Sequence, residues 1–192
     1  MVTTQTAYLA LLVLLALERG FELWLSRRNA ALAFARAGVE LGRAHYVWMR
    51  LLHTSFFLAC ALEVLLLHRT FDARLGLPML LLAGAAQALR YWAITTLGPC
   101  WNVRVIVVPG APVVTAGPYR WLRHPNYAAV IAEGIAVPLV HGAWLTALGF
   151  TLANAWLLRT RMRVEERALG DYCDPEGELV GRPRLLPFGG AR

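Results

Sequence analysis

The chain has 192 residues, of which 58% are hydrophobic and 16% are charged. This composition is too apolar for an ordinary soluble domain, and the length fits a single domain. The net charge is +7, but every basic residue is an arginine, and the arginines are scattered through short connections between apolar stretches. This pattern argues against a nucleic-acid-binding surface. We therefore expect an integral membrane protein that contacts lipids and has no nucleic-acid partner.

Five apolar stretches approach the ~20 residues that a helix needs to cross a bilayer. They cover residues 7–25, 46–67, 77–97, 126–140 and 142–160. The predicted fold class is all-α, with about five transmembrane helices. The last two stretches are separated only by His141, so we expect them to form a hairpin or a re-entrant pair.

The distribution of arginine predicts the orientation of these helices. Arginines gather after the first, third and fifth stretches, whereas the connections after the second and fourth carry few or none. Cytoplasmic connections are enriched in basic residues. We therefore expect the N-terminus outside the cell and the C-terminus in the cytosol.

Two connections between the apolar stretches carry local structural signals. Residues 26–45 combine arginines with an Ala-rich run, which predicts a short helix lying along the membrane interface. Residues 98–125 form a long polar connection, in which a β-branched run at 103–108 and another at 112–115 flank Pro109-Gly110. This order predicts a short cytosolic β-hairpin.

The end of this polar connection concentrates residues that could bind a ligand. It reads Gly-Pro-Tyr-Arg-Trp-Leu-Arg-His-Pro-Asn-Tyr over residues 117–127. Pro125 suits the first turn of the next helix, whose free N–H groups would favour an anion. His124 adds a hydrogen-bond donor, and Tyr119 and Tyr127 add hydroxyl groups and aromatic faces that attract cations. An interfacial belt of Trp, Tyr and Arg would have a similar composition.

A second charged run follows the last apolar stretch. Arg161 and Glu165 are four residues apart, so they share one face of a helix. A simple surface ion pair would have the same spacing. A hydrophobic hairpin, however, returns to the membrane face from which it started, and this would bring Arg161 and Glu165 close to the first motif. Glu165 could then bind a hydroxyl or ammonium group, and Arg161 an anionic group.

Neither a metal site nor a Rossmann cofactor site is expected. The three cysteines, at positions 60, 100 and 173, lie far apart and form no CxxC pair. Gly98, Gly110 and Gly117 are too widely spaced for the turn that binds a dinucleotide.

Together the two motifs resemble those of the isoprenylcysteine carboxyl methyltransferase superfamily. Its signature is an Arg-His-Pro-x-Tyr element, here residues 123–127, and a later Glu-Glu-x-x-Leu element, here residues 165–169. The resemblance covers about residues 90–172. It implies a multispan membrane enzyme that uses S-adenosyl-L-methionine, with the cofactor held by cytosolic elements and a lipophilic acceptor entering from the bilayer. The domain would then comprise N-terminal spans in 1–75, a cofactor-binding core in 76–172 and a tail in 173–192.

The resemblance also implies roles for individual residues. Arg161 and Glu165 would be the catalytic residues, and Arg161 would also face the acceptor. The cofactor would contact Arg104, Ala111, Pro112, Val113, Val114, Tyr119, His124, Pro125, Asn126, Tyr127, Glu165 and Glu166. His53, Arg90 and Asn154 are polar residues in or near apolar stretches, where polarity is costly and often functional. We assign them to acceptor binding, although interhelical hydrogen bonding would equally explain His53.

The first half of the chain is similar to a bacterial branch of the superfamily, which implies the inner membrane of a bacterium. In that branch the acceptors are often long-chain alkylpyrones or alkylresorcinols. O-methylation of such a polyketide is the leading interpretation, and carboxyl methylation of a prenylcysteine-like substrate is the second. An NADPH-dependent membrane reductase and a non-enzymatic membrane scaffold remain alternatives from other classes.

Overall fold

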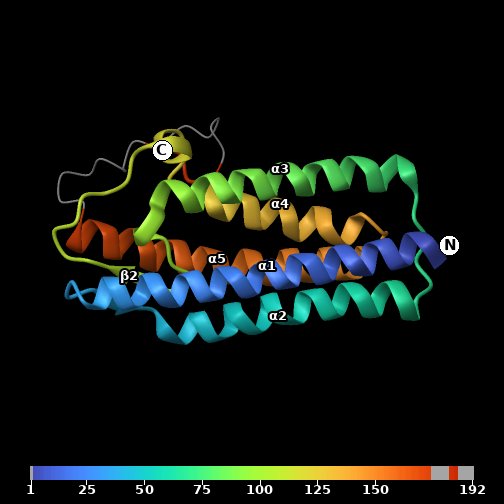
Figure 1. The fold of residues 1–192 in the computed structure, drawn as a ribbon, viewed down its shortest axis with the longest axis horizontal. Coiled ribbons are helices and arrows are strands. Elements are labelled where there is room, and N and C mark those ends of the chain that lie inside the picture. Colours follow the sequence, from blue (N-terminus) through green and yellow to red (C-terminus); the bar gives the residue numbers. More distant parts are fainter. Residues whose placement is uncertain (1, 174–181, 186–192) are drawn as a thin grey trace.

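The computed structural model describes residues 2–173 and 182–185, which form five α-helices. The helices are α1 (Val2–Phe34), α2 (Arg43–Leu66), α3 (Ala73–Leu97), α4 (Pro125–Leu139) and α5 (Trp144–Tyr172). Two short strands, β1 (Val39–Leu41) and β2 (Val105–Val107), and two 3₁₀ turns, η1 (Gly98–Cys100) and η2 (Gly117–Arg120), complete the fold. Figure 1 shows an elongated bundle with the N-terminus at one end and the strands at the other.

The helices fit the expected all-α membrane protein. Within the described residues, α2 and the stretch Ala73–Cys100 are long and apolar enough to cross a bilayer by length and composition. Helix α4 has only 15 residues, which gives it a length of about 22 Å against a hydrocarbon core of about 30 Å. The short α4 followed at once by α5 is the hairpin that the sequence predicts. The number of spans and their orientation stay predictions.

The predicted interfacial helix at residues 26–45 is wrong. Helix α1 continues through this region to Phe34, because no Gly or Pro interrupts the stretch after Gly20. Two polar residues of this stretch, Ser26 and Asn29, also face the protein. Ser26 donates a hydrogen bond to Asn102 at 2.7 Å, and Asn29 donates one to the carbonyl oxygen of Trp101 at 2.8 Å. These bonds fasten α1 to the connection after α3.

The predicted β-hairpin within residues 103–115 is also wrong, although its first strand exists. Strand β2 pairs antiparallel with β1, so that Val39 lies opposite Val107 and Leu41 opposite Val105. The 112–115 run forms no strand, and Pro112 has no N–H to donate to a ladder. Val105 and Val107 instead pack beside Val39, Leu41 and Ala168 of α5. The sheet therefore links the α1–α2 connection to the end of α5.

The two ends of the bundle are held together differently. Far from the strands, apolar side chains from α1, α2, α4 and α5 form a continuous core, in which Tyr8, Phe56, Val137 and Phe150 take part. Nearer the strands, polar side chains join the helices. Arg90 of α3 donates to Glu133 of α4 at 2.9 Å and lies 3.8 Å from Glu22 of α1. Because buried charges are stable only when paired, these contacts fix the relative positions of three helices.

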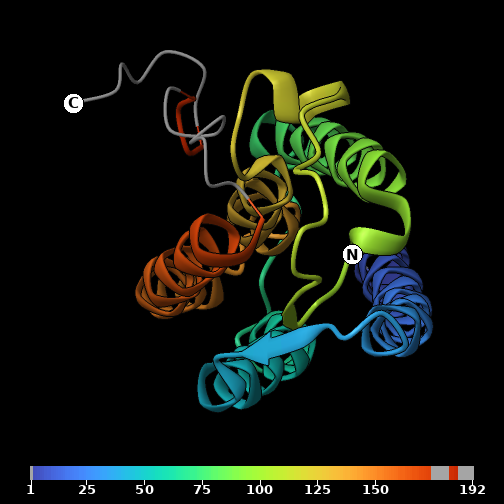
Figure 2. The same cartoon turned by 90° about the vertical axis from the view of Figure 1, so that its left-hand side faces the viewer.

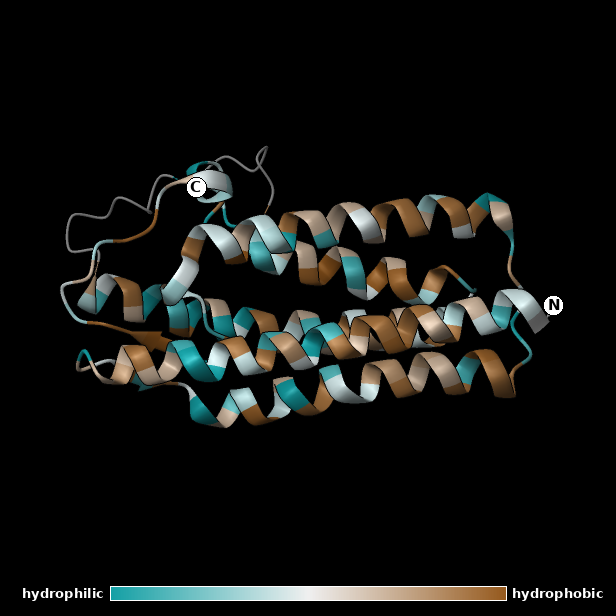
Figure 3. Ribbon diagram, viewed as in Figure 1, coloured by the Kyte–Doolittle hydropathy of each residue, from teal (hydrophilic) through white to brown (hydrophobic). Residues whose placement is uncertain are grey.

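Exposed tryptophans mark a level on the outside of the bundle. Trp24, Trp92 and Trp156 are all exposed, on α1, α3 and α5 respectively. Figure 3 shows the change along the bundle from mainly hydrophobic helices to more polar ones near the strands. Tryptophan is enriched where a membrane meets water. The exposure of these three residues agrees with a membrane boundary near the strand end, and the position of that boundary stays a prediction.

Glu63 of α2 fixes the start of α5. Its carboxylate accepts hydrogen bonds from the backbone N–H groups of Leu145 at 3.1 Å and Thr146 at 2.7 Å, and from the Thr146 hydroxyl. Arg69 donates to it as well, at 2.9 Å. The first N–H groups of a helix have no partner within the helix, so this carboxylate replaces an N-cap side chain.

We expect Glu63→Ala to lower the free energy of unfolding in detergent by about 1–3 kcal/mol, because the first N–H groups of α5 and the Arg69 guanidinium lose their acceptor. Glu63→Gln should cost less, since its carbonyl oxygen can still accept. Arg74→Ala, at an exposed position in α3, is the control. Equal stability of all three variants in denaturant titrations would contradict this role of Glu63.

Candidate functional site

The first motif begins at a turn that only glycine can form without strain. Gly117 has φ +54°, and a Cβ atom there would lie 2.5 Å from the Thr96 hydroxyl oxygen of α3. Gly117 therefore lets the η2 turn sit directly against the end of α3. Pro118, Tyr119 and Leu122 are then buried, which anchors the motif to the bundle.

The motif ends at the start of α4, where Pro125 occupies the first turn as predicted. His124 is the N-cap residue, but its side chain forms no capping hydrogen bond. The ring instead stacks on Tyr127, with centroids 5.1 Å apart and planes inclined by 20°. Its Nε2 lies 3.1 Å from Glu166 and its Nδ1 lies 3.9 Å from Glu165.

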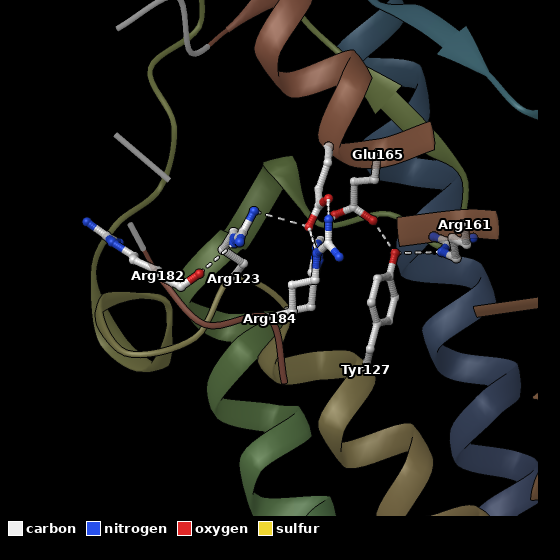
Figure 4. A network of polar contacts seen from close by, with 8 residues as sticks. Arg123, Tyr127, Arg161, Glu165, Arg182 and Arg184 are labelled. Atoms are coloured by element: carbon white, nitrogen blue, oxygen red, sulfur yellow. Dashed lines mark hydrogen bonds and ion pairs between the residues drawn. The ribbon is translucent and has the colours of Figure 1, made fainter. Parts of the chain in front are cut away.

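The two motifs meet through the hydroxyl group of Tyr127. Arg161 donates a hydrogen bond from Nε to this oxygen at 2.6 Å, and the hydroxyl donates in turn to the Glu165 carboxylate. Figure 4 shows Tyr127 on α4 lying between Arg161 and Glu165 on α5. The predicted convergence of the motifs at one end of the bundle is therefore confirmed. The four-residue spacing of Arg161 and Glu165 lets one hydroxyl group contact both.

These residues face a cavity of about 210 Å³ at the strand end of the bundle. Figure 2, which looks onto this end, shows the connection after α3 crossing the space between the helices. One wall is polar and includes Tyr119, His124, Tyr127, Arg161 and Glu165. The opposite wall is apolar and is described below.

Most residues that the sequence assigns to the cofactor line this one cavity. They are Arg104, Ala111, Pro112, Val113, Val114, Tyr119, His124, Asn126, Tyr127 and Glu165. Two assigned residues are not part of its lining. Pro125 supports the start of α4, and Glu166 lies behind His124. The predicted residues that line the cavity are thus up to 61 positions apart in the sequence, from Arg104 to Glu165.

The three residues assigned to acceptor binding lie deeper in the bundle and do not line the cavity. Asn154 is two helical turns before Arg161 on the same face of α5. It is buried, and its side-chain oxygen has no partner among the described residues. Arg90 is held by Glu133, and His53 bonds the carbonyl oxygen of Met49 through Nδ1 at 2.8 Å. Their contact with an acceptor stays a prediction.

Sequence reasoning missed the contribution of α1 to the cavity. Asn29, Leu32 and Ala33 of α1 line it, and so does Arg36 just after the helix. The reason for the omission is the mistaken interfacial helix, which would have placed these residues away from the bundle. The spacing of Ser26 and Asn29 on one helix face is the signal that could have revealed their position.

The local charges set the protonation of two groups beside the cavity. Burial and the nearby Glu165 charge raise the pKa of Tyr119, so its phenol stays protonated and can donate. Burial opposes ionisation of Glu166, but hydrogen bonds from His124 and Arg184 outweigh it and lower the pKa of Glu166 to about 2. Because its pKa is lower in the folded than in the unfolded protein, ionised Glu166 stabilises the fold at pH values above the ordinary pKa of a glutamate. This stabilisation is lost only as the pH falls toward 2. Glu166 therefore stays charged at neutral pH.

A second hollow, of about 500 Å³, lies between α2 and α5 but has a different character. It is an open groove lined mainly by Leu52, Phe56, Leu62, Leu145 and Phe150, near the other end of the bundle. Among the described residues that line it, only Glu63, Ser55 and Thr146 have polar or charged side chains. Of these, Glu63 and Thr146 are hydrogen-bonded to each other. The chemistry therefore belongs to the smaller cavity.

Comparison with known proteins agrees with the geometry of the two motifs. The model of the isoprenylcysteine carboxyl methyltransferase family matches residues 78–171, which include α4 and both motifs. The chain belongs to this family. It is also 38% identical over 163 residues to YpbQ of Bacillus subtilis strain 168, described as an uncharacterized protein. The match covers 84% of this chain and 96% of the relative. Family membership indicates a membrane methyltransferase.

The cavity fits the cofactor of this methyltransferase family. The side-chain oxygen of Asn126 is buried in its wall and has no partner among the described residues, so it can accept a hydrogen bond from a ligand. The Glu165 carboxylate can bind an ammonium or hydroxyl group, and the ring faces of Tyr119 and Tyr127 suit a cationic centre. The site thus offers a hydrogen-bond acceptor, a carboxylate and aromatic faces, which suit the hydroxyl, ammonium and sulfonium groups of S-adenosylmethionine.

Gly117→Ala should destabilise the methyltransferase fold by about 1–2 kcal/mol from backbone strain alone, with a further loss from the contact with Thr96. Gly149→Ala is the matched control, because that glycine lies in α5 with open space around it. The control should be neutral or slightly stabilising. Thermal unfolding followed by tryptophan fluorescence measures both variants, and equal midpoints would refute the requirement for glycine at 117.

Proposed function

We propose that the chain is an S-adenosylmethionine-dependent O-methyltransferase that transfers the methyl group to an oxygen of a lipophilic molecule. A long-chain alkylpyrone or alkylresorcinol is the leading acceptor, and the carboxylate of a prenylcysteine-like molecule is the second. We further propose that the site faces the cytosol of a bacterial inner membrane, in agreement with the arginines around it.

The burial and the hydrogen bonding of Arg161 are the observation that carries this proposal. Arg161 is only 6% exposed, yet it lines the cavity. Among the described residues only its Nε has a hydrogen-bond partner, the Tyr127 hydroxyl. The two terminal amino groups can therefore bind an anion. A buried guanidinium fixed by Tyr127 is a suitable partner for an ionised enol or carboxylate.

The apolar wall of the cavity and its depth support a lipophilic acceptor. Leu32 and Ala33 of α1 and Leu97, Pro99 and Trp101 around η1 form this wall. The exposed Trp24, Trp92 and Trp156 each lie five residues before a lining residue of the same helix, namely Asn29, Leu97 and Arg161. That spacing is about 7.5 Å along a helix. The cavity therefore lies just beyond the apolar layer, where an acceptor could keep its chain in lipid.

When bound, the cofactor supplies a methyl group on a sulfonium, which is transferred to the acceptor oxygen by an in-line displacement. The protein contributes mainly orientation and exclusion of water. Arg161 would hold the acceptor oxygen, while Glu165 and Asn126 would bind the polar end of the cofactor. An acceptor that is already ionised needs no base, which agrees with the engagement of Glu165 by Tyr127.

The cofactor proposal predicts stabilisation by S-adenosylhomocysteine. At ~100 times its dissociation constant the ligand should add roughly 2.7 kcal/mol to the stability of the purified protein. His124→Ala should abolish the shift, whereas Arg159→Ala, at an exposed position of α5, should keep it. If the folded wild type shows no shift but does respond to a nicotinamide nucleotide, the reductase alternative replaces the methyltransferase.

The acceptor proposal predicts that Arg161→Ala lowers kcat/KM by about 100-fold or more, because a buried charged hydrogen bond to the acceptor is lost. Affinity for S-adenosylhomocysteine should change only a few-fold. Product analysis by mass spectrometry, with an alkylpyrone, an alkylresorcinol and a farnesylcysteine derivative offered separately, identifies the substrate. If Arg161→Ala keeps the wild-type kcat/KM for the acceptor identified in this way, Arg161 does not bind the acceptor.

A further inference from the structure

Residues 182–185 lie against the first motif, although they follow α5 in the sequence. The backbone N–H of Arg123 donates to the carbonyl oxygen of Pro183 at 2.9 Å, and that of His124 to the carbonyl oxygen of Arg184 at 3.0 Å. The Arg123 side chain also donates to the carbonyl oxygen of Arg182 at 2.7 Å. We call residues 182–185 the C-terminal strap. It satisfies N–H groups that precede α4 and that the helix itself cannot satisfy.

The strap is also tied to the motif by its own side chains. Arg182 donates to the carbonyl oxygen of Tyr119 at 2.6 Å. Leu185 packs on a cluster formed by Tyr127, Leu158 and Met162. The contacts therefore involve the η2 turn, the start of α4 and the polar end of α5. Figure 4 shows Arg182 and Arg184 beside Arg123 at the edge of the polar network.

Arg184 connects the strap to a residue of the cavity wall. Its guanidinium donates from Nε and Nη2 to the two oxygens of Glu166, at 2.8 and 2.7 Å. Glu166 in turn bonds Nε2 of His124 at 3.1 Å, and Arg123 adds a longer contact at 3.4 Å. A two-point contact of this kind fixes the direction of the carboxylate. The orientation of the His124 ring thus depends on Arg184 through Glu166.

We propose that the C-terminal strap supports the cofactor site from outside and that Arg184 is a positioning residue, which orients His124 through Glu166. This inference rests on the proposed function, because it assigns the ligand of the cavity to S-adenosylmethionine. Arg184 lies outside the cavity lining, so its effect on the ligand is indirect. The exposed Arg184 side chain contributes little to the core, and its replacement should leave the fold intact.

The test is a double-mutant cycle measured by calorimetric titration with S-adenosylhomocysteine. Arg184→Ala should weaken binding about tenfold, and Arg184→Lys should recover part of the loss. In a Glu166→Ala background, Arg184→Ala should have no further effect. Arg167→Ala, which removes the same charge from an exposed position next to Glu166, is the control and should bind like the wild type. Unchanged affinity in Arg184→Ala, or losses that simply add, would overturn the proposal.

Amide hydrogen exchange provides a measurement that needs no ligand. The N–H groups of Arg123 and His124 should be protected in the wild type and should exchange faster in Arg184→Ala. Unprotected amides in the wild type would overturn the strap itself. If the amides behave as expected but the wild type does not bind S-adenosylhomocysteine, the proposed function fails while the contact of the strap stands.

Discussion

The hydrogen bonds of the Tyr127 hydroxyl are the constraint on which the site depends. This one oxygen accepts from Arg161 and donates to Glu165, so it joins the start of α4 to the polar end of α5. The bond to Arg161 also orients a buried guanidinium so that its terminal groups can face the cavity. A buried charge without such a partner would be costly. The structure therefore holds a buried cation in the wall of the cavity.

The rest of the bundle serves to bring these two helix ends together. Glu63 fixes the start of α5 at the far end, and the short α4–α5 hairpin returns the chain to the strand end. The pairing of β1 with β2 then packs the connection after α3 against Ala168 of α5. Because each contact joins segments distant in the sequence, the cavity forms only when the whole bundle is assembled.

The cavity combines two chemical environments. Its polar wall comes from the two motifs, and its apolar wall comes from α1 and the η1 turn. This combination agrees with the proposal that a charged cofactor arrives from water and a lipophilic acceptor from lipid. The polar wall lies at the end of the bundle where polar networks rather than apolar packing join the helices.

The sequence by itself determined the helical membrane class and the two motifs. Pro125 at a helix start and the four-residue spacing of Arg161 and Glu165 are local signals with which the structure agrees. Of the five predicted apolar runs, two form helices long and apolar enough to cross a membrane among the described residues. Only the tertiary structure decided the partner of β2, the course of α1 beyond residue 26 and the contact of the strap with His124. These features depend on hydrogen bonds between distant segments. Local propensity and spacing can show which face of a helix is polar, but they do not identify the distant partner of that face.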